Sequence, residues 1–189
     1  MKYTFSIVSH KQFQLCEVAI RSIYSKVKED FEIILTINSD ESVSIPERWR
    51  DRLTLLYNES PLGFGRNHNK AFNYANGDFF VVVNPDTEIS VWKEFELAKR
   101  ILYSPVILNS DNTIADFRRS YPSVMNLLRR RLKKVPLEKD DWFAGVFLII
   151  SYDYYKELGG FDESFFMYLE DTDFSVRVKR TNGSLSVLE

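Results

Sequence analysis

The chain has 189 residues, of which 44% are hydrophobic and 28% charged, a balance that suits one globular domain with a buried core. A formal net charge of -2 gives no basis for nucleic-acid binding, and a single cysteine, Cys16, excludes an internal disulfide framework. The first ten residues lack the features of a signal peptide, and no apolar run reaches the roughly 20 residues of a membrane span. We therefore expect one cytoplasmic domain over residues 1–189.

The first half of the chain alternates between short apolar runs and helical patterns. A helical spacing of apolar residues runs from Cys16 to Val27, and a second helix opens at Gly63-Phe64-Gly65. This order predicts an α/β fold with a mostly parallel sheet flanked by helices, whose ligands lie at the carboxyl ends of the strands. The predicted strands are residues 3–9, 31–37, 53–57 and 79–83. The polar residues just past them are Ser9, His10, Asn38, Asp40, Asn58, Asn84 and Asp86.

The second half is less regular. We expect strands over residues 105–108 and 142–151, and helices over residues 91–100, 123–134 and 170–180. Residues 135–141 are expected to form a charged loop. No repeat, low-complexity tract or interdomain linker divides the chain.

Asn84-Pro85-Asp86 follows an apolar run and allows two interpretations. A carboxylate at the end of a strand can bind a hard divalent cation, which in turn holds a diphosphate. The tripeptide is also a simple turn that ends a strand, and on its own letters the turn is the better interpretation.

The glycine-rich segment before the second helix is similarly ambiguous. Gly63 and Gly65 let the backbone approach a ligand, and the helix that follows offers free N–H groups to a phosphate. Asn67 and Asn69 can bond to a ribose or a sugar. A strand-to-helix turn with polar caps is the alternative, and we expect His68 to be a hydrogen-bonding helix residue rather than a metal ligand.

Three acids crowd the start of the last predicted helix. Glu170, Asp171 and Asp173 complement a helix dipole, and Asp173 can pair with Arg177 one turn later. Clustered acids at the end of an aromatic segment can instead raise one pKa and provide a general base. Both interpretations stand from these residues alone.

Taken together, these blocks resemble the family 2 glycosyltransferases of bacterial polysaccharide synthesis, which have the GT-A fold. Ser9-His10 and the segment Arg118-Arg119-Ser120-Tyr121-Pro122 also match a subgroup described as rhamnosyltransferase-like. The most specific match is the block over residues 159–173. The other matching blocks are residues 58–69, Asn84-Pro85-Asp86 and Trp142-Phe143-Ala144-Gly145.

The resemblance implies an inverting enzyme that moves a sugar, rhamnose among the candidates, from a nucleoside-diphosphate sugar to a glycan or polyprenyl-diphosphate-linked acceptor with Mg²⁺ or Mn²⁺. It implies that Asp86 is the metal ligand and Asp171 the catalytic base, with Glu170 beside it. Residues 1–86 would then form the nucleotide-sugar half and residues 87–189 the acceptor and catalytic half. The implied donor-binding residues are Ser9, His10, Asn38, Asp40, Asn58, Gly63, Gly65, Asn67, Asn84 and Asp86. The implied acceptor-binding residues are Trp142, Ala144, Gly145 and Tyr168.

Two departures from the family pattern leave other functions open. The base-reading aspartate of the family is replaced here by Ile37 or Asn38, and its metal-site histidine has no counterpart before Glu189, so the chain looks truncated. A non-catalytic homologue that binds a nucleotide sugar or a glycan is therefore one alternative. A nucleotidyltransferase is the other, although the residues after the first strand contain none of the glycines typical of those enzymes.

A basic segment suggests contact with a membrane surface. Leu127, Leu128 and Leu132 lie among its charges at helical spacing, and such a helix can rest on anionic lipid. A solvated helix whose leucines pack on the domain explains the pattern equally well. Residues 118–134 contain no acid and seven basic residues, which are Arg118, Arg119, Arg129, Arg130, Arg131, Lys133 and Lys134.

Overall fold

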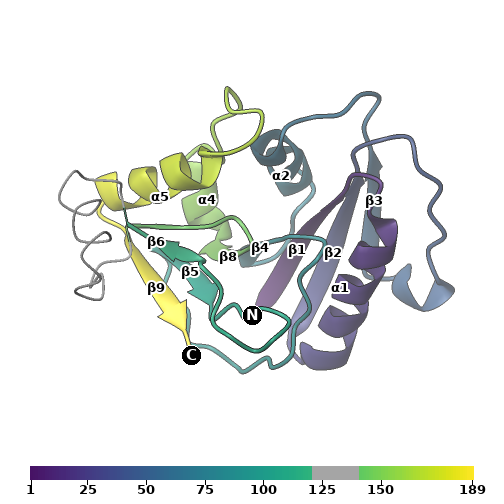
Figure 1. The fold of residues 1–189 in the computed structure, drawn as a ribbon, viewed down its shortest axis with the longest axis horizontal. Coiled ribbons are helices and arrows are strands. Elements are labelled where there is room, and N and C mark those ends of the chain that lie inside the picture. Colours follow the sequence, from purple (N-terminus) through teal and green to yellow (C-terminus); the bar gives the residue numbers. More distant parts are fainter. Residues whose placement is uncertain (121–140) are drawn as a thin grey trace.

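A central sheet of seven strands organises the computed structural model, which describes residues 1–120 and 141–189 (Figure 1). The strand order is β3-β2-β1-β4-β8-β5-β9. Its strands are β1 (Lys2–Ser9), β2 (Asp30–Ile37), β3 (Leu53–Tyr57), β4 (Phe79–Val83), β5 (Ile101–Pro105), β8 (Phe147–Ser151) and β9 (Ser184–Leu188). A small second sheet pairs β6 (Arg118–Arg119) with β7 (Trp142–Phe143). The helices are α1 (Phe13–Lys26), η1 (Glu47–Trp49), α2 (Phe64–Phe72), α4 (Tyr152–Glu157) and α5 (Glu170–Arg180).

The predicted parallel half of the sheet is confirmed. β1 pairs in parallel with β2 and β4, and β2 pairs in parallel with β3. All five residues of β4 are buried, as expected of a central strand that is covered on both faces. The predicted boundaries of the first four strands match the structure to within one residue.

Two apolar layers hold helices against the opposite faces of this sheet. Alternate residues of β1, such as Phe5, pack with α1 residues such as Ile20. On the other face, β4 residues such as Phe80 pack with side chains of α2, α4 and α5, including Phe174. Because successive strand residues point to opposite faces, this division defines a helix–sheet–helix sandwich.

The second half of the sheet reverses direction. β8 runs antiparallel to β4 and to β5, while β9 is parallel to β5. As a result, the residues that precede β8 reach the same edge as those that follow β4. This edge carries the candidate active site.

Three predictions for the second half are wrong. Residues 91–100, predicted as a helix, form none, because Trp92 and Leu97 both pack on the core and the Trp92 indole N–H donates to Glu29 at 2.9 Å. The strand expected over residues 105–108 lies earlier, as β5, whose residues are more buried than residues 106–108. The expected strand over residues 142–151 is interrupted after Phe143, where the Gly145 turn separates β7 from β8.

The basic helix predicted over residues 123–134 and the charged loop that follows it lie outside the described residues, except for Asp141. Arg118 and Arg119, which begin the basic segment, are exposed and form β6. Among the described residues, no helix has both the length and the apolar character needed to cross a membrane.

Candidate active site

The parallel strands end together at one edge of the sheet. Ser9, the last residue of β1, pairs with Ile37 at the end of β2, and Ile37 pairs with Tyr57 at the end of β3. The next residues continue this pattern, because the Asn38 N–H donates to the Ser9 carbonyl at 2.8 Å and the Asn58 N–H to the Ile37 carbonyl at 3.0 Å. These polar residues therefore lie where ligands bind α/β sheets.

Asn84 and Asp86 reach the same edge from β4. Val83, the last residue of β4, pairs with Ile7 near the end of β1. The Asn84 N–H then donates to the Val146 carbonyl at 2.9 Å, and the Asp86 side chain is exposed to solvent. Asp86 is therefore a solvent-facing carboxylate at the edge where β1 and β2 also end.

Three asparagines predicted to bind the donor bond to one another and to a turn. The Asn38 Oδ1 accepts from the Leu62 N–H and from the Asn58 Nδ2, both at 2.8 Å, and its Nδ2 donates to the Leu62 carbonyl at 3.0 Å. The Asn67 Nδ2 donates to the Leu62 and Gly63 carbonyls at 3.0 Å. Their amides thus shape the Leu62-Gly63 turn, and direct contact with a donor stays a prediction.

Glu41, which was missed from the sequence, anchors the segment after β1. Its carboxylate accepts a bond of 2.5 Å from the Ser9 hydroxyl and bonds of 3.0 and 3.3 Å from the N–H groups of Lys11 and Phe13. Since α1 has no acid in its first turn, a carboxylate from another segment caps the helix. Of the other two predicted donor residues nearby, His10 lies 3.5 Å from the Asn38 amide nitrogen and Asp40 is exposed.

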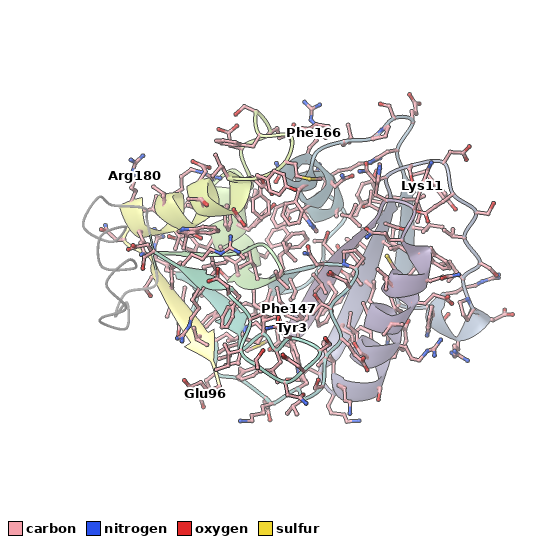
Figure 2. The ribbon with its side chains drawn as sticks, in the orientation of Figure 1. Tyr3, Lys11, Glu96, Phe147, Phe166 and Arg180 are labelled. Atoms are coloured by element: carbon pink, nitrogen blue, oxygen red, sulfur yellow. The ribbon has the colours of Figure 1, made fainter. Side chains whose placement is uncertain are left out.

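The glycine turn packs against the segment that leads into α5. A Cβ on Gly63 would clash with the Phe166 carbonyl oxygen, and a Cβ on Gly65 would lie 2.6 Å from the Phe161 Cβ. Both contacts are too close for any larger residue. Figure 2 shows Phe166 and Lys11, which follows β1, on the same side of the molecule, with Glu96 on the other side.

Asp171 is held at the start of α5 by backbone donors. The Gly145 N–H donates to its Oδ2 at 3.0 Å, and the Thr172 N–H donates to its Oδ1 at 2.7 Å. Asp173 instead pairs with Arg177 one turn later, at 2.7 Å, which confirms the structural interpretation of that residue. Among the described residues, Asp171 is therefore the partly exposed carboxylate of this helix start that forms no ion pair.

The backbone just before Asp171 is strained. Tyr168 and Leu169 have φ angles of 69° and 72°, in the left-handed region that disfavours side chains. Such conformations cost on the order of 1–3 kcal/mol each and persist where the surrounding structure enforces them, often at functional sites. The strained pair turns the chain directly into α5.

Glu170 is buried beside Asp171. Its side chain is 6% exposed, and its Oε2 has no hydrogen-bond partner among the described residues. Burial raises the pKa of this carboxyl above its ordinary value, and the neighbouring charge of Asp171 adds to the rise. The buried environment therefore favours the protonated form of the Glu170 carboxyl.

We expect Glu170→Gln to stabilise the fold at neutral pH. A raised folded-state pKa makes the wild-type protein lose stability as pH rises from the ordinary glutamate range through that pKa, and Gln removes this loss. The variant should match the wild type near pH 4 and exceed it at pH 7 by roughly 1 kcal/mol or more, because a buried ionised carboxylate is costlier than a buried neutral amide. Urea unfolding at both pH values measures this difference, and equal stability at pH 7 would contradict it.

Asp86 can contribute to a metal site but cannot form one alone. Among the described residues, no group of three His, Cys, Asp or Glu side chains is arranged to hold an ion. A single exposed carboxylate nevertheless fits Mg²⁺ or Mn²⁺, since such ions are commonly held by one or two carboxylates, substrate phosphates and water. His68 is not available, because it is buried and bonded to Ser6 at 2.8 Å, and burial lowers its pKa to about 3.

The four predicted acceptor-binding residues have different environments. Trp142 is half-buried under the Arg119 guanidinium, 5.1 Å from its ring centre, and the Ala144 N–H donates to the Phe117 carbonyl at 2.9 Å. Gly145 holds Asp171, and Tyr168 is 78% exposed. Phe166, Met167 and Leu169, also exposed, surround Tyr168 in sequence. The exposed apolar loop therefore adjoins the carboxylates, a feature that the sequence indicated only through Tyr168.

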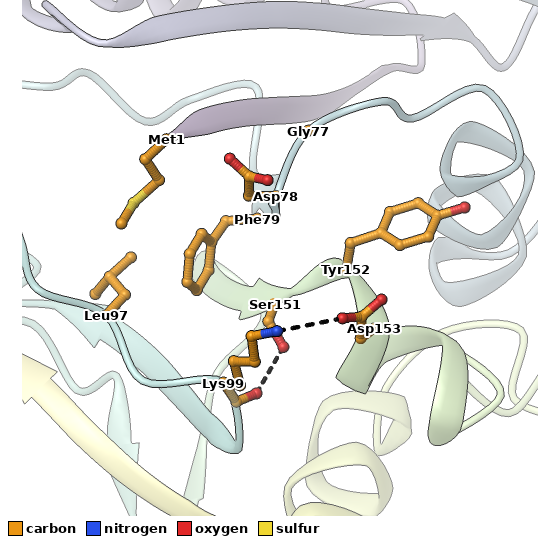
Figure 3. A pocket seen from close by; sticks show the side chains of 9 residues that line it. All are labelled: Met1, Gly77, Asp78, Phe79, Leu97, Lys99, Ser151, Tyr152 and Asp153. Atoms are coloured by element: carbon orange, nitrogen blue, oxygen red, sulfur yellow. Dashed lines mark hydrogen bonds and ion pairs between the residues drawn. The ribbon is translucent and has the colours of Figure 1, made fainter.

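A cavity of about 390 Å³ lies at the opposite edge of the sheet (Figure 3). It opens at the amino-terminal ends of β1 and β4, beside Met1 and Phe79, and the Lys99–Asp153 ion pair flanks it at 3.7 Å. None of the predicted site residues lines this cavity. It is therefore distinct from the site at the carboxyl edge.

The fold is that of the GT-A glycosyltransferases. The structure of GalNAc-T7 with UDP, GalNAc and Mn²⁺ superimposes with a TM-score of 0.76 at 16% identity, covering 99% of this chain and 41% of that one. At this identity the likeness establishes the fold alone.

The chain belongs to glycosyltransferase family 2, because the family model "Glycosyl transferase family 2" matches residues 5–159. It is 25% identical to the rhamnosyltransferase WbbL of Escherichia coli K12 over 91% of this chain and 75% of that protein. It is also 25% identical to the low-salt glycan biosynthesis hexosyltransferase Agl10 of Haloferax volcanii, over 93% of this chain but 61% of that protein.

Proposed function

We propose that this chain transfers a sugar, with rhamnose the first candidate, from a nucleoside-diphosphate sugar to a hydroxyl of a glycan or polyprenyl-diphosphate-linked acceptor. The observation that carries this proposal is the Asp171 carboxylate, oriented by the Gly145 N–H at 3.0 Å beside the glycine turn. The relatives WbbL and Agl10 are named for rhamnosyl and hexosyl transfer, which supports the substrate class.

Asp171 acts in the proposed reaction as the general base. It accepts the proton of the acceptor hydroxyl while that oxygen attacks the anomeric carbon, and the bond to the diphosphate breaks on the opposite face. Displacement from the opposite face inverts the anomeric centre. The backbone N–H groups of Gly145 and Thr172 aim the carboxylate before the acceptor arrives, which is how preorganised sites lower a barrier.

Asp86 is proposed to hold the divalent ion together with the donor's phosphate oxygens. The ion, when bound, would neutralise charge on the diphosphate leaving group. The polar edge formed by Ser9, Asn38 and Asn58 is proposed to face the nucleotide, with the glycine turn beside it. No carboxylate occupies position 38, so we expect weaker discrimination among nucleobases than an aspartate would give.

The exposed loop before α5 is proposed to receive the acceptor. Tyr168 and Phe166 offer aromatic faces within a few residues of Asp171, and the apolar faces of sugar rings pack well on such surfaces. Trp142 would contribute less directly, because the Arg119 guanidinium covers part of its ring.

A panel of nucleoside-diphosphate sugars tests the function. We expect release of nucleoside diphosphate from at least one donor, and a product with inverted anomeric configuration by NMR once an acceptor is supplied. Asp171→Asn provides the matched control. Saturable donor binding without turnover would instead indicate the non-catalytic homologue.

The basic segment over residues 118–134 is proposed to bind the cytoplasmic face of a membrane. Most of this segment lies outside the described residues, and the proposal rests on its seven basic side chains and the absence of acids. Co-sedimentation with vesicles rich in acidic lipid at low salt tests it. A protein that stays in the supernatant would rule the proposal out.

A further inference from the structure

Phe64 links the two sides of the candidate site. It is the first residue of α2, and its backbone N–H donates to the Phe166 carbonyl at 3.0 Å, which joins the glycine turn to the loop before α5. Its ring packs against His68 and Phe161, with ring centres 4.5 and 5.6 Å away. The residue is thus anchored through its backbone and its side chain.

The Phe64 ring also lies directly against the Gly145 turn. A Cβ placed on Gly145 would be 2.9 Å from the Phe64 Cζ and 3.7 Å from the Asp171 Cβ. Glycine at this position therefore lets three elements meet: the start of α2, the turn before β8 and the start of α5. Gly145 uses the same close approach to donate its N–H to the Asp171 Oδ2.

We propose that Phe64 is a positioning residue for the catalytic carboxylate: its ring supports the Gly145 turn, and the Gly145 N–H in turn orients Asp171. The inference rests on the proposed role of Asp171 as the base. Phe64 belongs to the glycine turn that is proposed to lie beside the nucleotide, and it would orient the carboxylate that acts on the acceptor. The packing of the α2 start against the turn that holds Asp171 comes from the Phe64 ring, and not from the glycines or acids of the site.

The chain offers a matched control on the same helix. Phe72, at the end of α2, is also half-buried and also packs among aromatic rings, with Tyr152 at 4.5 Å and Tyr155 at 4.6 Å. Its ring is not among the groups that a Cβ on Gly145 would meet, which are the Phe64 ring and the Asp171 Cβ. Phe64→Leu and Phe72→Leu should therefore lose similar packing while differing in their effect on the site.

Two measurements test the proposal on the full chain. Amide hydrogen exchange at Gly145, followed by NMR, reports the bond to Asp171 without any need for activity. We expect Phe64→Leu to speed this exchange by about 10-fold or more, as expected when a local hydrogen bond opens. Release of nucleoside diphosphate should show kcat about 10–100-fold lower with the donor KM within about 3-fold, since a misplaced catalytic group costs rate rather than ground-state binding. Phe72→Leu should change neither quantity beyond about 2-fold.

A second variant tests the contact itself. Gly145→Ala should lower kcat in the wild-type background because the new methyl group meets the Phe64 ring. The loss should be smaller in Phe64→Leu, which lacks the Cζ atom, so the two substitutions should be non-additive. Unchanged Gly145 exchange in Phe64→Leu, equal effects of Phe64→Leu and Phe72→Leu on kcat, or strict additivity would each overturn the proposal. A wild-type protein that releases no nucleoside diphosphate would refute the proposed function, while the exchange result still decides whether Phe64 supports the turn.

Discussion

Replacing Asp171 with Asn is expected to lower sugar transfer by about 10²–10⁴-fold while leaving donor binding nearly unchanged. Asn has almost the same shape, and its one side-chain oxygen can accept either the Gly145 N–H, now at 3.0 Å, or the Thr172 N–H, now at 2.7 Å, but not both. It cannot accept a proton from the acceptor hydroxyl, so the loss should fall on kcat. Steady-state kinetics with a fixed acceptor and varied donor separate the two effects.

Asp173→Asn is the matched control for this experiment. Asp173 is also in the first turn of α5, but its carboxylate pairs with Arg177 at 2.7 Å. Its loss should affect stability, by about 0.3–0.5 kcal/mol as for other helical ion pairs, more than turnover. A fully active Asp171→Asn enzyme would exclude Asp171 as the base and leave Glu170 as the next carboxylate to test.

Replacing Asp86 with Asn is expected to weaken metal binding in the presence of nucleotide by on the order of 10-fold or more. Asp86 is exposed at the carboxyl edge of the sheet, and no described cluster of three ligating side chains can substitute for it. The remaining ligands must then come from the diphosphate and water. Wild-type protein should bind Mn²⁺ weakly alone and more tightly with a nucleoside diphosphate.

Calorimetric titration of Mn²⁺ with and without nucleoside diphosphate measures both quantities. Glu88→Gln is the control, because Glu88 is an exposed carboxylate two residues away that the sequence pattern does not assign to the metal. Tight Mn²⁺ binding that is independent of nucleotide, or unaltered binding in Asp86→Asn, would contradict the assignment. Equal losses in both variants would indicate a general charge effect instead.

The sequence predicts the parallel half of the fold well because its signals are local. Central strands such as β4 are buried on both faces and read as continuous apolar runs, while helices such as α5 begin with acids and end with basic residues. These features do not depend on distant partners. The location of the candidate site was predicted from the same local signals, since the carboxyl ends of parallel strands share one edge, and that location stays a prediction.

The errors fall where distant contacts override local patterns. Residues 91–100 carry helix-compatible apolar spacing, yet Trp92 bonds to Glu29 and packs against Tyr3 in the aromatic core. β9 was missed because its half-buried residues gain their partners only by pairing with β5 at the edge of the sheet. Neither interaction has a signature within its own segment.

The internal geometry of the site was equally out of reach. Polar spacing indicated which asparagines follow the strands but not that Asn38 and Asn58 bond to each other. Glu41 gave no local signal because the helix that it caps begins at Phe13, 28 residues earlier in the chain. The cap is a hydrogen bond from the Phe13 N–H to the Glu41 carboxylate. The contact of Phe64 with Gly145 joins residues that are far apart in the chain, and only the close approach of the glycine reveals it.

The reversal of chain direction between β4 and β8 has a consequence for substrate size. Val83 pairs with Phe147, and one residue further the Asn84 N–H still donates to the Val146 carbonyl at 2.9 Å. Asp86 follows this bond by two residues on one side, and Gly145, whose N–H holds Asp171, precedes it by one residue on the other. In the proposed reaction the gap between leaving group and base is therefore constrained by the pairing of β4 with β8. Variants with altered sugar preference should arise from side chains around that gap, since widening it would require breaking that pairing.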